Sequence, residues 1–543
     1  MEIDLATVEA PGEAVRAQVC VIGAGIAGLA LARRLALGGA DVVVLEAGGR
    51  CLEADGQEIF ASAELRGKAN LGTTEGRFRV FGGSSLRWGG QVLALGGGAA
   101  WPVRPEEMAP FVEEAERLLE VGKLPFDAAG FFAAIGAPVP PLLPELSGVD
   151  ARVSKWMAYP RRNLAASLGR ELLGRARVYL HAQVVELQLG LESRCAEGAS
   201  SPAYHPGRVA SVVVKTPAGA LARFQAQEVV LAAGTVETVR LLLASRSVAE
   251  AGVGNAQDQV GRNFHDHLTL PAATLTGEAR ERVAGELRPW VFFAGWSDML
   301  GGTLHSVKLE ASMELRKRLD LNPILAHIAI EEPPGRGVGV VREMLTAWQQ
   351  GKIGRALAAH ALKIPEAMLD GARLVLGAKL QNRRFLSSKA ILSLQFNVAQ
   401  DAPSRSRITL GDRLDPFGVP QAVVDWRVTS HEVGSIRRYA AHLREQFQAR
   451  GLKGVQWARG VLDGEEPMEG LEDARHAMGG ACMGEDPRSS VVDAQMRVHG
   501  VENLSIAGAA TFPDGTPQLP SLTMLALALR LADRIQARLA DQG

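Results

Sequence analysis

The clearest pattern of apolar and polar positions lies near the amino terminus. An apolar run over 19–22 leads into a glycine-rich turn at 23–28, and apolar residues at helical spacing follow over 29–35. A second apolar run covers 42–45. This order predicts a buried strand, a tight turn, a helix and a second buried strand, which together begin an α/β domain.

The three glycines of the turn suit a bound dinucleotide. Gly23 allows the tight turn, Gly25 lets the backbone approach a pyrophosphate, and Gly28 allows close packing of the helix. Glu46, at the end of the second strand, is placed to accept hydrogen bonds from ribose hydroxyls. We therefore expect an adenine dinucleotide rather than a purely structural glycine turn. The residues expected at this site are Gly23, Gly25, Ile26, Ala27, Gly28, Glu46, Ala47 and Gly48.

Further apolar runs predict more strands of the same domain. Residues 178–189 and 208–215 have the pattern of a hairpin or meander. Residues 227–235 form a buried strand pattern that ends in small residues, and a helical pattern follows. Because open α/β sheets bind cofactors at the carboxyl ends of their strands, small side chains there leave room for a ligand. The residues concerned are Ala233 and Gly234.

The pattern changes in the middle of the chain. Alternation over 268–330 suits strands of a second sheet, and strands are also expected over 391–400, 406–410 and 422–426. Residues 431–448 have helical spacing. Candidate aromatic walls of a pocket in this second sheet are Trp290, Phe292, Phe293 and Trp296.

Residues 337–384 have helical spacing and carry more basic than acidic side chains. Two interpretations are open. Amphipathic helices form a cap over the active site, or a basic apolar face rests on a membrane surface. We expect the cap, because an amphipathic helix more often packs against its own protein.

Composition narrows the classes of function. The 543-residue chain has a formal net charge of −1, which does not favour nucleic acid as the main partner, and its length suits two or more domains. The four cysteines have no metal-binding spacing. No secretory signal and no convincing membrane-spanning run is evident in the sequence, so we expect a cytoplasmic protein.

A second glycine-rich segment, 81–91, contains four glycines, which permit the backbone to lie flat against a ligand. The segment is either a flexible surface loop or a loop that covers a flavin ring and its diphosphate, and we favour the second. Ser84 and Ser85 would then donate hydrogen bonds, and Trp88 would form an aromatic wall. The expected contacts are Gly83, Ser84, Ser85, Trp88, Gly89 and Gly90.

This loop resembles a segment of the glucose-methanol-choline (GMC) oxidoreductases, flavoproteins that oxidise alcohols. Its GGSS and WGG motifs are most similar to the sugar-oxidising branch that includes pyranose oxidase. The resemblance extends to RHAMGGACMG at 475–484 and NLSIAG at 503–508. It implies an α/β protein with a Rossmann-like FAD-binding domain and a second, substrate domain with a mostly antiparallel sheet and a helical insertion. The implied FAD-binding segments are 14–100, 175–268 and 470–543, and the substrate segments are 101–174 and 269–469, with the cap around 337–384.

The resemblance also implies how the flavin is held. In some relatives a histidine just before the tryptophan is covalently joined to the flavin. Arg87 stands at that place here, so we expect non-covalent FAD. The backbone of Val184 would meet the adenine, and the start of the last helix would bind the pyrimidine edge of the flavin. The further cofactor contacts implied are Ala233, Gly234, Gly508, Ala509, Leu519, Pro520 and Leu522.

His476 stands where the family keeps its catalytic base. Oxidation of an alcohol needs a group that accepts the hydroxyl proton, and an imidazole has a suitable pKa. The family normally supplies a second histidine or asparagine near the last helix, but this place holds Leu519. Gln518 or Ser521 would substitute for it, or His476 acts alone, or the substrate is bulky and apolar at this point.

His265 and His267 flank Asp266 in a segment typical of the family. Two histidines beside an aspartate suggest a metal site, but the sequence shows no third ligand. We expect a structural turn that makes hydrogen bonds, and no metal.

The sequence thus predicts an FAD-dependent oxidoreductase that oxidises a small-molecule alcohol, such as a sugar or a glycosylated or secondary metabolite. We favour a dehydrogenase over an oxidase, with an unknown electron acceptor. Two alternatives stay open. Leu519 admits a non-redox or light-driven lyase on the same scaffold, and the basic helical insertion admits a membrane-surface flavoprotein that binds a lipid-linked partner.

Overall fold

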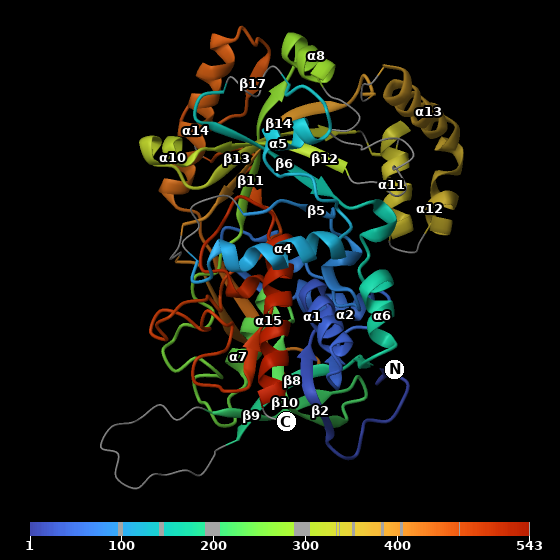
Figure 1. Cartoon of the computed structure of the whole chain (residues 1–543), viewed down its shortest axis with the longest axis vertical. Coiled ribbons are helices and arrows are strands. Elements are labelled where there is room, and N and C mark those ends of the chain that lie inside the picture. The colour runs from blue at the N-terminus through green and yellow to red at the C-terminus, as the bar shows by residue number, and fades with distance from the viewer. Residues whose placement is uncertain are drawn as a thin grey trace.

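The computed structural model divides into two layers stacked along the long axis, each built around a large sheet (Figure 1). It describes residues 1–95, 101–140, 146–190, 207–286, 304–332, 334–335, 337–349, 353–381, 385–401, 405–465 and 467–541. The expected aromatic walls Trp290, Phe292, Phe293 and Trp296 lie outside these residues.

The first sheet contains the predicted dinucleotide turn. Its strands are parallel except at one edge, where β9 and β8 run antiparallel. All four residues of β3 are buried, as expected of a parallel strand covered on both faces. The strand order is β1 (Glu2–Asp4), β7 (Arg177–Leu180), β3 (Val42–Leu45), β2 (Val15–Ile22), β10 (Leu221–Leu231), β9 (Arg208–Lys215) and β8 (Gln183–Gly190), and β19 (Leu504–Ile506) pairs with β10.

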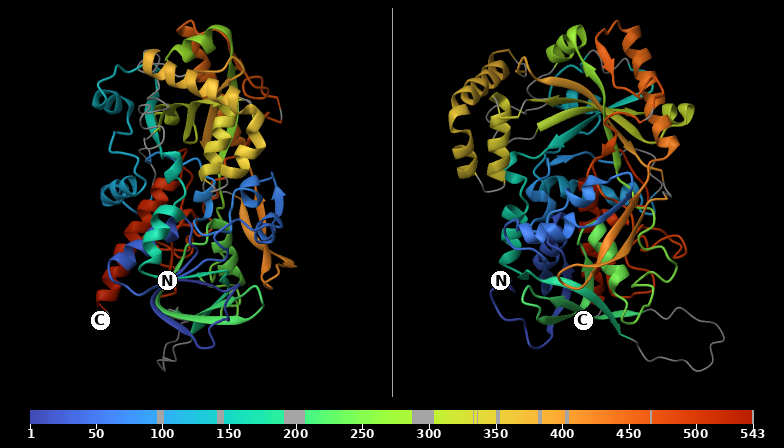
Figure 2. Two further views of the ribbon diagram at one scale, coloured as in Figure 1. Left: turned by 90° about the vertical axis from the view of Figure 1, so that its right-hand side faces the viewer. Right: turned by 180° about the vertical axis from the view of Figure 1, so that it is seen from behind.

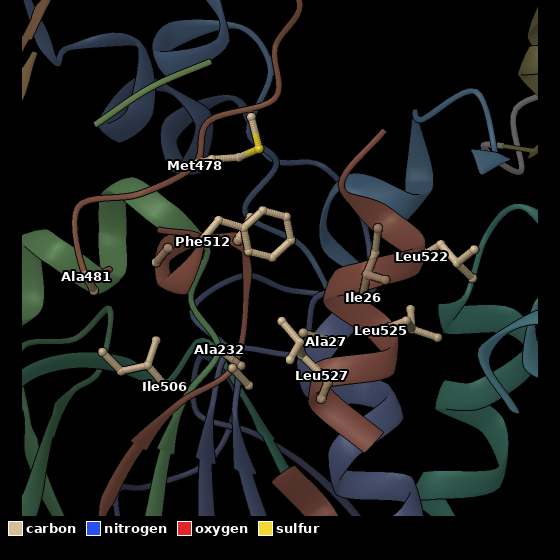
Figure 3. Packing of buried hydrophobic residues seen from close by; sticks show 14 of the residues in the cluster. Ile26, Ala27, Ala232, Met478, Ala481, Ile506, Phe512, Leu522, Leu525 and Leu527 are labelled. Carbon is tan, nitrogen blue, oxygen red and sulfur yellow. The ribbon is translucent and has the colours of Figure 1, made fainter. Parts of the chain in front are cut away.

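Two helices distant in sequence pack side by side against this sheet. α1 (Ile26–Leu37) follows the glycine turn, and α15 (Ser521–Asp541) comes at the end of the chain. Figure 3 shows side chains of α1, Ile26 and Ala27, near Leu522, Leu525 and Leu527 of α15. Their mutual burial fixes the start of each helix at the same edge of the sheet.

Glycine is required at two points of the turn. Gly23 has φ +101°, and an added Cβ would lie 2.5 Å from the carbonyl oxygen of Ala232. A Cβ on Gly28 would lie 2.0 Å from the carbonyl oxygen of Gly23. The predicted roles of these two glycines, a tight turn and close helix packing, therefore agree with the geometry.

The second sheet is antiparallel throughout. α14 (Ser430–Ala449) packs on one of its faces, where Tyr439 donates to the carbonyl of Leu309 at 2.8 Å. The strand order is β17 (Val455–Trp457), β11 (His267–Leu275), β14 (Ile391–Ala399), β13 (Ile324–Glu331), β12 (Leu304–Ala311), β6 (Val149–Trp156) and β5 (Gln91–Val92), and β18 (Glu472–Asp473) pairs with β11.

The strands predicted over 268–330 are present as β11, β12 and β13, but helices also form in this range. α8 (Gly277–Glu286) and α10 (Met313–Leu319) interrupt the strands. Both segments are rich in charged residues with high helix propensity, and Ser312 caps α10 by accepting from the amide of Leu315 at 3.1 Å. The local propensity and the cap outweigh the apparent alternation.

A small third sheet joins distant parts of the chain in the order β15 (Arg407–Leu414), β16 (Pro420–Trp426) and β4 (Glu64–Gly67). α7 (Thr235–Ala244) packs against β15 and β16. The remaining helices of the first half are α2 (Ala54–Ala61), α3 (Leu71–Thr74), α4 (Pro105–Leu118), α5 (Ala128–Ala134) and α6 (Arg170–Leu173).

Two boundary segments lie elsewhere than the expected domain limits place them. β5, within 14–100, pairs with β6 in the second sheet. α4, within 101–174, packs against α15 of the first layer. The positions of β5 and α4 depend on contacts with residues far along the chain, and local sequence patterns do not reveal such contacts.

Residues 337–381 form the expected helices: α11 (Gly337–Gln349), α12 (Ile353–His360), the short η4 (Ala361–Lys363) and α13 (Ile364–Gln381). They pack on one another. They project from the side of the layer built around the second sheet, which is the upper layer in the figures (Figure 2). Within the described part of the chain, none of the helices combines the length and the apolar character needed to cross a membrane.

Candidate active site

A cavity of about 810 Å³ lies where the glycine turn, the second glycine-rich loop and the carboxyl-terminal segments meet. Its walls come from parts of the chain that are hundreds of residues apart, including the turn after β2, the turn after β10 and the start of α15. Gln91 and Trp156 of the second sheet complete the wall. Its size is that of a pocket for a cofactor and a substrate.

The turn after β2 fits a pyrophosphate. Gly25 is the residue before the first turn of α1, where backbone N–H groups have no partner within the helix. A Cβ on Gly25 would meet no atom within 4 Å, and the same holds for Gly234 and Gly508. These three glycines line the cavity from three different segments. Because they lack side chains, they leave space at the cavity wall that a larger residue would occupy.

Glu46 lies beside this turn with its carboxylate held by the backbone. Its oxygens accept from the amide of Ala24 at 2.8 Å and from the amide of Gly48 at 2.9 Å. Burial raises the pKa of Glu46, although both hydrogen bonds and the charge of Arg79 oppose this shift. The carboxylate is therefore oriented at the cavity wall, as a ribose contact requires.

The second glycine-rich loop lies directly on the first turn. A Cβ on Gly83 would come within 2.9 Å of the Cα of Gly25. Trp88 donates its indole N–H to the carbonyl of Arg162 at 2.7 Å, which fixes the ring in the wall. Arg87, at the place of covalent attachment in some relatives, also lines the cavity.

Most of the predicted site residues line this one cavity. They are Gly23, Gly25, Ile26, Ala27, Glu46, Ala47, Gly83, Ser84, Trp88, Gly89, Gly90, Val184, Ala233, Gly234, His476, Gly508, Ala509, Leu519, Pro520 and Ser521.

Five predicted residues do not line it, and each has a packing or hydrogen-bonding reason. Gly28 packs α1 against Gly23, and Gly48 holds the Glu46 carboxylate. Ser85 donates to the carbonyl of Gly82 at 2.6 Å, which ties the loop to itself. Leu522, on α15, is fully buried in the hydrophobic core (Figure 3).

Gln518 is the fifth and was a candidate to replace the missing polar residue at Leu519. Its side chain is buried, and its amide donates to the carboxylate of Glu310 at 2.7 Å. This bond directs the amide toward β12 instead of toward the cavity. Gln518 is therefore not placed to assist His476.

The imidazoles of His476 and His267 are in direct contact. Their Nδ1 atoms are 3.1 Å apart, and the ring planes meet at 77°. His476 is partly exposed in the wall of the cavity, whereas His267 is fully buried behind it. Sequence reasoning placed His267 in a structural turn and missed this contact.

Both imidazoles are neutral at pH 7. Burial lowers the pKa of His476 to about 4, against an opposing effect of the Asp473 carboxylate. Burial, and then the His476 and His265 rings, lowers the pKa of His267 well below its usual value. In a neutral pair, Nδ1 of one ring carries a proton and donates a hydrogen bond to the lone pair on Nδ1 of the other ring.

Two buried carboxylates hold the segment that carries His476. Asp266 accepts from the backbone amide of His476 at 2.9 Å and from the Nδ2 of Asn70 at 3.2 Å. Asp473 accepts from the amides of Gly72 at 2.8 Å and Arg475 at 3.0 Å. Arg475 itself has φ +60°, an uncommon backbone state for a non-glycine residue that these hydrogen bonds maintain.

The cavity contains charged residues that the sequence did not single out. Arg77 and Glu237 form an ion pair at 2.7 Å, and Glu237 also pairs with Arg240 at 3.0 Å. Arg79 stacks over the ring of Phe417, with 5.0 Å between its Cζ and the ring centroid. Arg77 and Arg79 come from a polar section without a recognisable motif, and Glu237 and Arg240 lie on α7 beyond the predicted turn, so no sequence signal identified them.

The histidines around Asp266 contact protein groups. His265 donates its Nδ1 proton to the carbonyl of Asn263 at 2.8 Å, and His267 faces His476. Among the described residues, no cluster of three or more histidine, cysteine, aspartate or glutamate side chains is arranged to hold a metal ion.

Comparison with protein families gives two matches. Residues 176–269 match the amino-terminal model and residues 402–528 match the carboxyl-terminal model of the GMC oxidoreductases. The two segments contain the turn after β10, both histidines of the contact and the start of α15.

Several characterised proteins are similar in sequence. The chain is 24% identical to 6'''-hydroxyparomomycin C oxidase of Streptomyces lividus over 98% of its own length and 93% of that protein. It is 27% identical to the fructose dehydrogenase large subunit of Gluconobacter japonicus over 58% of its own length, and it spans 48% of that protein. It is 26% identical to pyranose 2-oxidase of Tricholoma matsutake over 27% of each protein.

The fold has a solved counterpart. The structure of a pyridoxine 4-oxidase from Mesorbium loti superposes with a TM-score of 0.53 at 19% identity, over 95% of this chain and 99% of that one. The chain therefore shares its overall fold with that structure.

We predict that Glu46→Gln weakens FAD binding. The amide cannot accept from both backbone N–H groups, so one end of the side chain turns away and its ribose contact is lost. We expect an affinity about tenfold lower, measured by titrating the apoprotein with FAD and following flavin fluorescence. Glu53→Gln, outside the cavity, serves as the control, and equal affinities of the two variants would contradict the prediction.

Proposed function

Because the chain belongs to the GMC oxidoreductases, we propose that it oxidises an alcohol in the cavity, with His476 as the base that accepts the hydroxyl proton. The observation that carries the proposal is the contact between His476 and His267. FAD, held non-covalently, supplies the hydride acceptor when bound.

The contact determines which nitrogen meets the substrate. Nδ1 of His476 faces His267, so the nitrogen available to a substrate hydroxyl is Nε2. A base must present a lone pair, and the neutral ring then carries its proton on Nδ1. This N–H donates a hydrogen bond to Nδ1 of His267. The proton of the neutral His267 ring is consequently on Nε2.

His267 thereby gives His476 a hydrogen-bonding partner, although it does not line the cavity as the residue at position 519 does. When His476 accepts the substrate proton it becomes an imidazolium, and Nδ1 of His267 accepts a hydrogen bond from that cation. A hydrogen bond to a charged donor is stronger than one between neutral groups. His267 is a positioning residue, since it is fully buried behind His476.

The second sheet offers a polar wall for a polyhydroxylated substrate. Gln91 reaches the cavity and contacts Ser154 Oγ at 2.6 Å and Ser306 Oγ at 3.1 Å. With its amide oriented to satisfy both ends, Gln91 also accepts from Nζ of Lys308 at 3.0 Å. Its NH₂ group is then directed away from these donors.

Burial lowers the pKa of Lys308 to about 7, so this buried group behind Gln91 carries at most a partial positive charge at neutral pH. The amide of Gln91 in the cavity wall suits an alcohol with several hydroxyl groups, such as a sugar or a glycosylated metabolite. Relatives named as acting on fructose, pyranoses and 6'''-hydroxyparomomycin C support this substrate class.

The proposal includes an electron acceptor other than oxygen, so that the enzyme works as a dehydrogenase. The relatives include both a dehydrogenase and oxidases. An anaerobic screen of sugars, glycosides and simple alcohols identifies the substrate by flavin bleaching. The re-oxidation rates of the bleached enzyme by oxygen and by artificial acceptors then separate the two classes.

We predict that His476→Ala lowers the rate of anaerobic flavin reduction by about 10²–10⁴-fold, because a general base contributes this much. FAD content should not change, because the FAD-fitting glycines are on other segments. His499→Ala is the matched control, since His499 contacts Ser490 and does not line the cavity. An unchanged reduction rate in His476→Ala would refute the role of the base, and turnover without bleaching would indicate a lyase.

We predict that His267→Leu slows flavin reduction more than His267→Asn does. Asparagine can place an oxygen acceptor near the position of Nδ1, whereas leucine cannot accept the proton of His476. We expect at least a tenfold difference in kcat at equal FAD content, measured by stopped-flow reduction. If both variants lose the same activity, His267 acts only through packing.

We predict that kcat/KM stays constant across neutral pH and falls as the pH drops through about 4. The base works in its deprotonated form, and burial lowers the pKa of His476 to about 4 from its ordinary value of 6.5. Below that pH, kcat/KM should fall about tenfold per pH unit. The measurement uses brief pH jumps with a return to neutral pH as a check for denaturation. An acid limb centred at 6.5 would contradict the burial argument.

A further inference from the structure

The helices over 337–381 expose an unusual number of large apolar side chains. Of the fifteen large apolar side chains that are exposed in the described residues, seven lie on these helices. Several are more exposed than half, with Leu362 at 98%, Leu380 at 78% and Met368 at 70%. The seven are Trp348, Leu357, Leu362, Met368, Leu369, Leu376 and Leu380.

The exposed residues of α13 form one stripe. Exposed apolar residues recur at intervals of four, three, four and four residues, which places them on one face of the helix. They are Pro365, Leu369, Ala372, Leu376 and Leu380. The buried residues Ala367 and Leu374 lie on the other side, and α13 packs against α11. A helix with apolar residues on both faces needs a second apolar surface to cover it.

The stripe does not face the cavity. None of the described residues of α11, α12 or α13 lines the cavity, so the expected cap over the site is not formed by them. The helices project from the side of the upper layer in the right-hand view of Figure 2 and face the viewer in the left-hand view.

The same segment has a charge opposite to that of the rest of the chain. Residues 337–384 contain eight basic and three acidic residues, a net charge of +5, whereas the whole chain has −1 and the remainder therefore −6. Of the basic side chains, Arg342, Lys363 and Arg373 are exposed on these helices. Basic residues next to exposed apolar ones are the pattern of a surface that contacts anionic lipids.

We propose that α11–α13 dock the protein onto the surface of an anionic lipid bilayer. The stripe of α13 and Leu362 insert among the acyl chains near the headgroups, and the basic side chains contact the negatively charged headgroups. The helices lie on the bilayer and do not cross it. The inference is independent of the oxidation chemistry, because it uses no residue of the cavity.

Vesicle flotation tests the proposal with the full chain. We expect the wild type to float with vesicles of phosphatidylcholine and phosphatidylglycerol, to float less with phosphatidylcholine alone, and to be released by added salt. The variant Leu362→Glu/Leu380→Glu should bind the anionic vesicles at least tenfold more weakly. The charge variant Arg342→Gln/Lys363→Gln should lose binding and salt sensitivity together.

The matched control is Leu221→Glu/Leu414→Glu, which places the same charges at exposed leucines of β10 and β15 (59% and 60% exposed). It should float like the wild type. Absence of flotation, or an equal loss in this control, would overturn the proposal. Equal flotation with neutral vesicles would overturn the role of anionic lipid.

Gel filtration without vesicles tests another occupant of the stripe. A concentration-dependent dimer that Leu362→Glu/Leu380→Glu abolishes, without flotation of the wild type, would assign the stripe to a second copy of the chain and overturn the proposal. Flavin reduction in vesicle-free buffer should be the same in all these variants. A failure of the docking proposal is thus distinguishable from a failure of the proposed oxidation.

Discussion

One buried carboxylate, that of Asp266, holds together the parts of the chain that form the candidate catalytic centre. It accepts from the backbone amides of His476 at 2.9 Å and His267 at 2.7 Å, and from Asn70 at 3.2 Å. Its own amide donates to Gln400 at 3.0 Å. A buried carboxylate without these donors would be costly, so the three segments are held in register around it. Burial and the neighbouring Asp473 raise the pKa of Asp266 to about 7.

This arrangement explains how a histidine pair forms without the usual polar residue before the last helix. The backbone of His476 is fixed by carboxylates, and its side chain is fixed by His267. The low dielectric environment keeps both rings neutral at pH 7. A neutral imidazole with one nitrogen engaged and the other open to a cavity is what proton abstraction from an alcohol requires. Leu519 itself lines the cavity as an apolar residue.

The two proposals concern different surfaces of the same layer. The sheet of the upper layer presents Gln91 of β5 and Trp156 of β6 to the cavity, while α11–α13 expose apolar and basic side chains to the outside. Polar residues inside are satisfied by one another. Apolar residues outside are satisfied only by contact with another apolar phase. Docking at a bilayer would thus leave the cavity and its histidines unchanged.

The sequence alone was sufficient to predict the features that depend on residues close together in the chain. The dinucleotide turn needs glycines a few residues apart and an acid at the end of the next strand, and Gly23, Gly25 and Glu46 all line the cavity. The helices over 337–381 follow from their own periodicity, and His476 lies within a short motif. The family and its FAD cofactor follow from the same short motifs.

The tertiary structure decided what depends on distant partners and on the direction of side chains. His267 and His476 are 209 residues apart, so no local pattern shows that their rings touch. Gln518 stands one residue from the expected position, but its bond to Glu310 turns it away. Spacing gives the place of a residue along the chain, whereas the direction of its side chain depends on the groups that packing brings beside it. The packing of β5 and α4 and the exposure of the α13 stripe depend on the same long-range contacts.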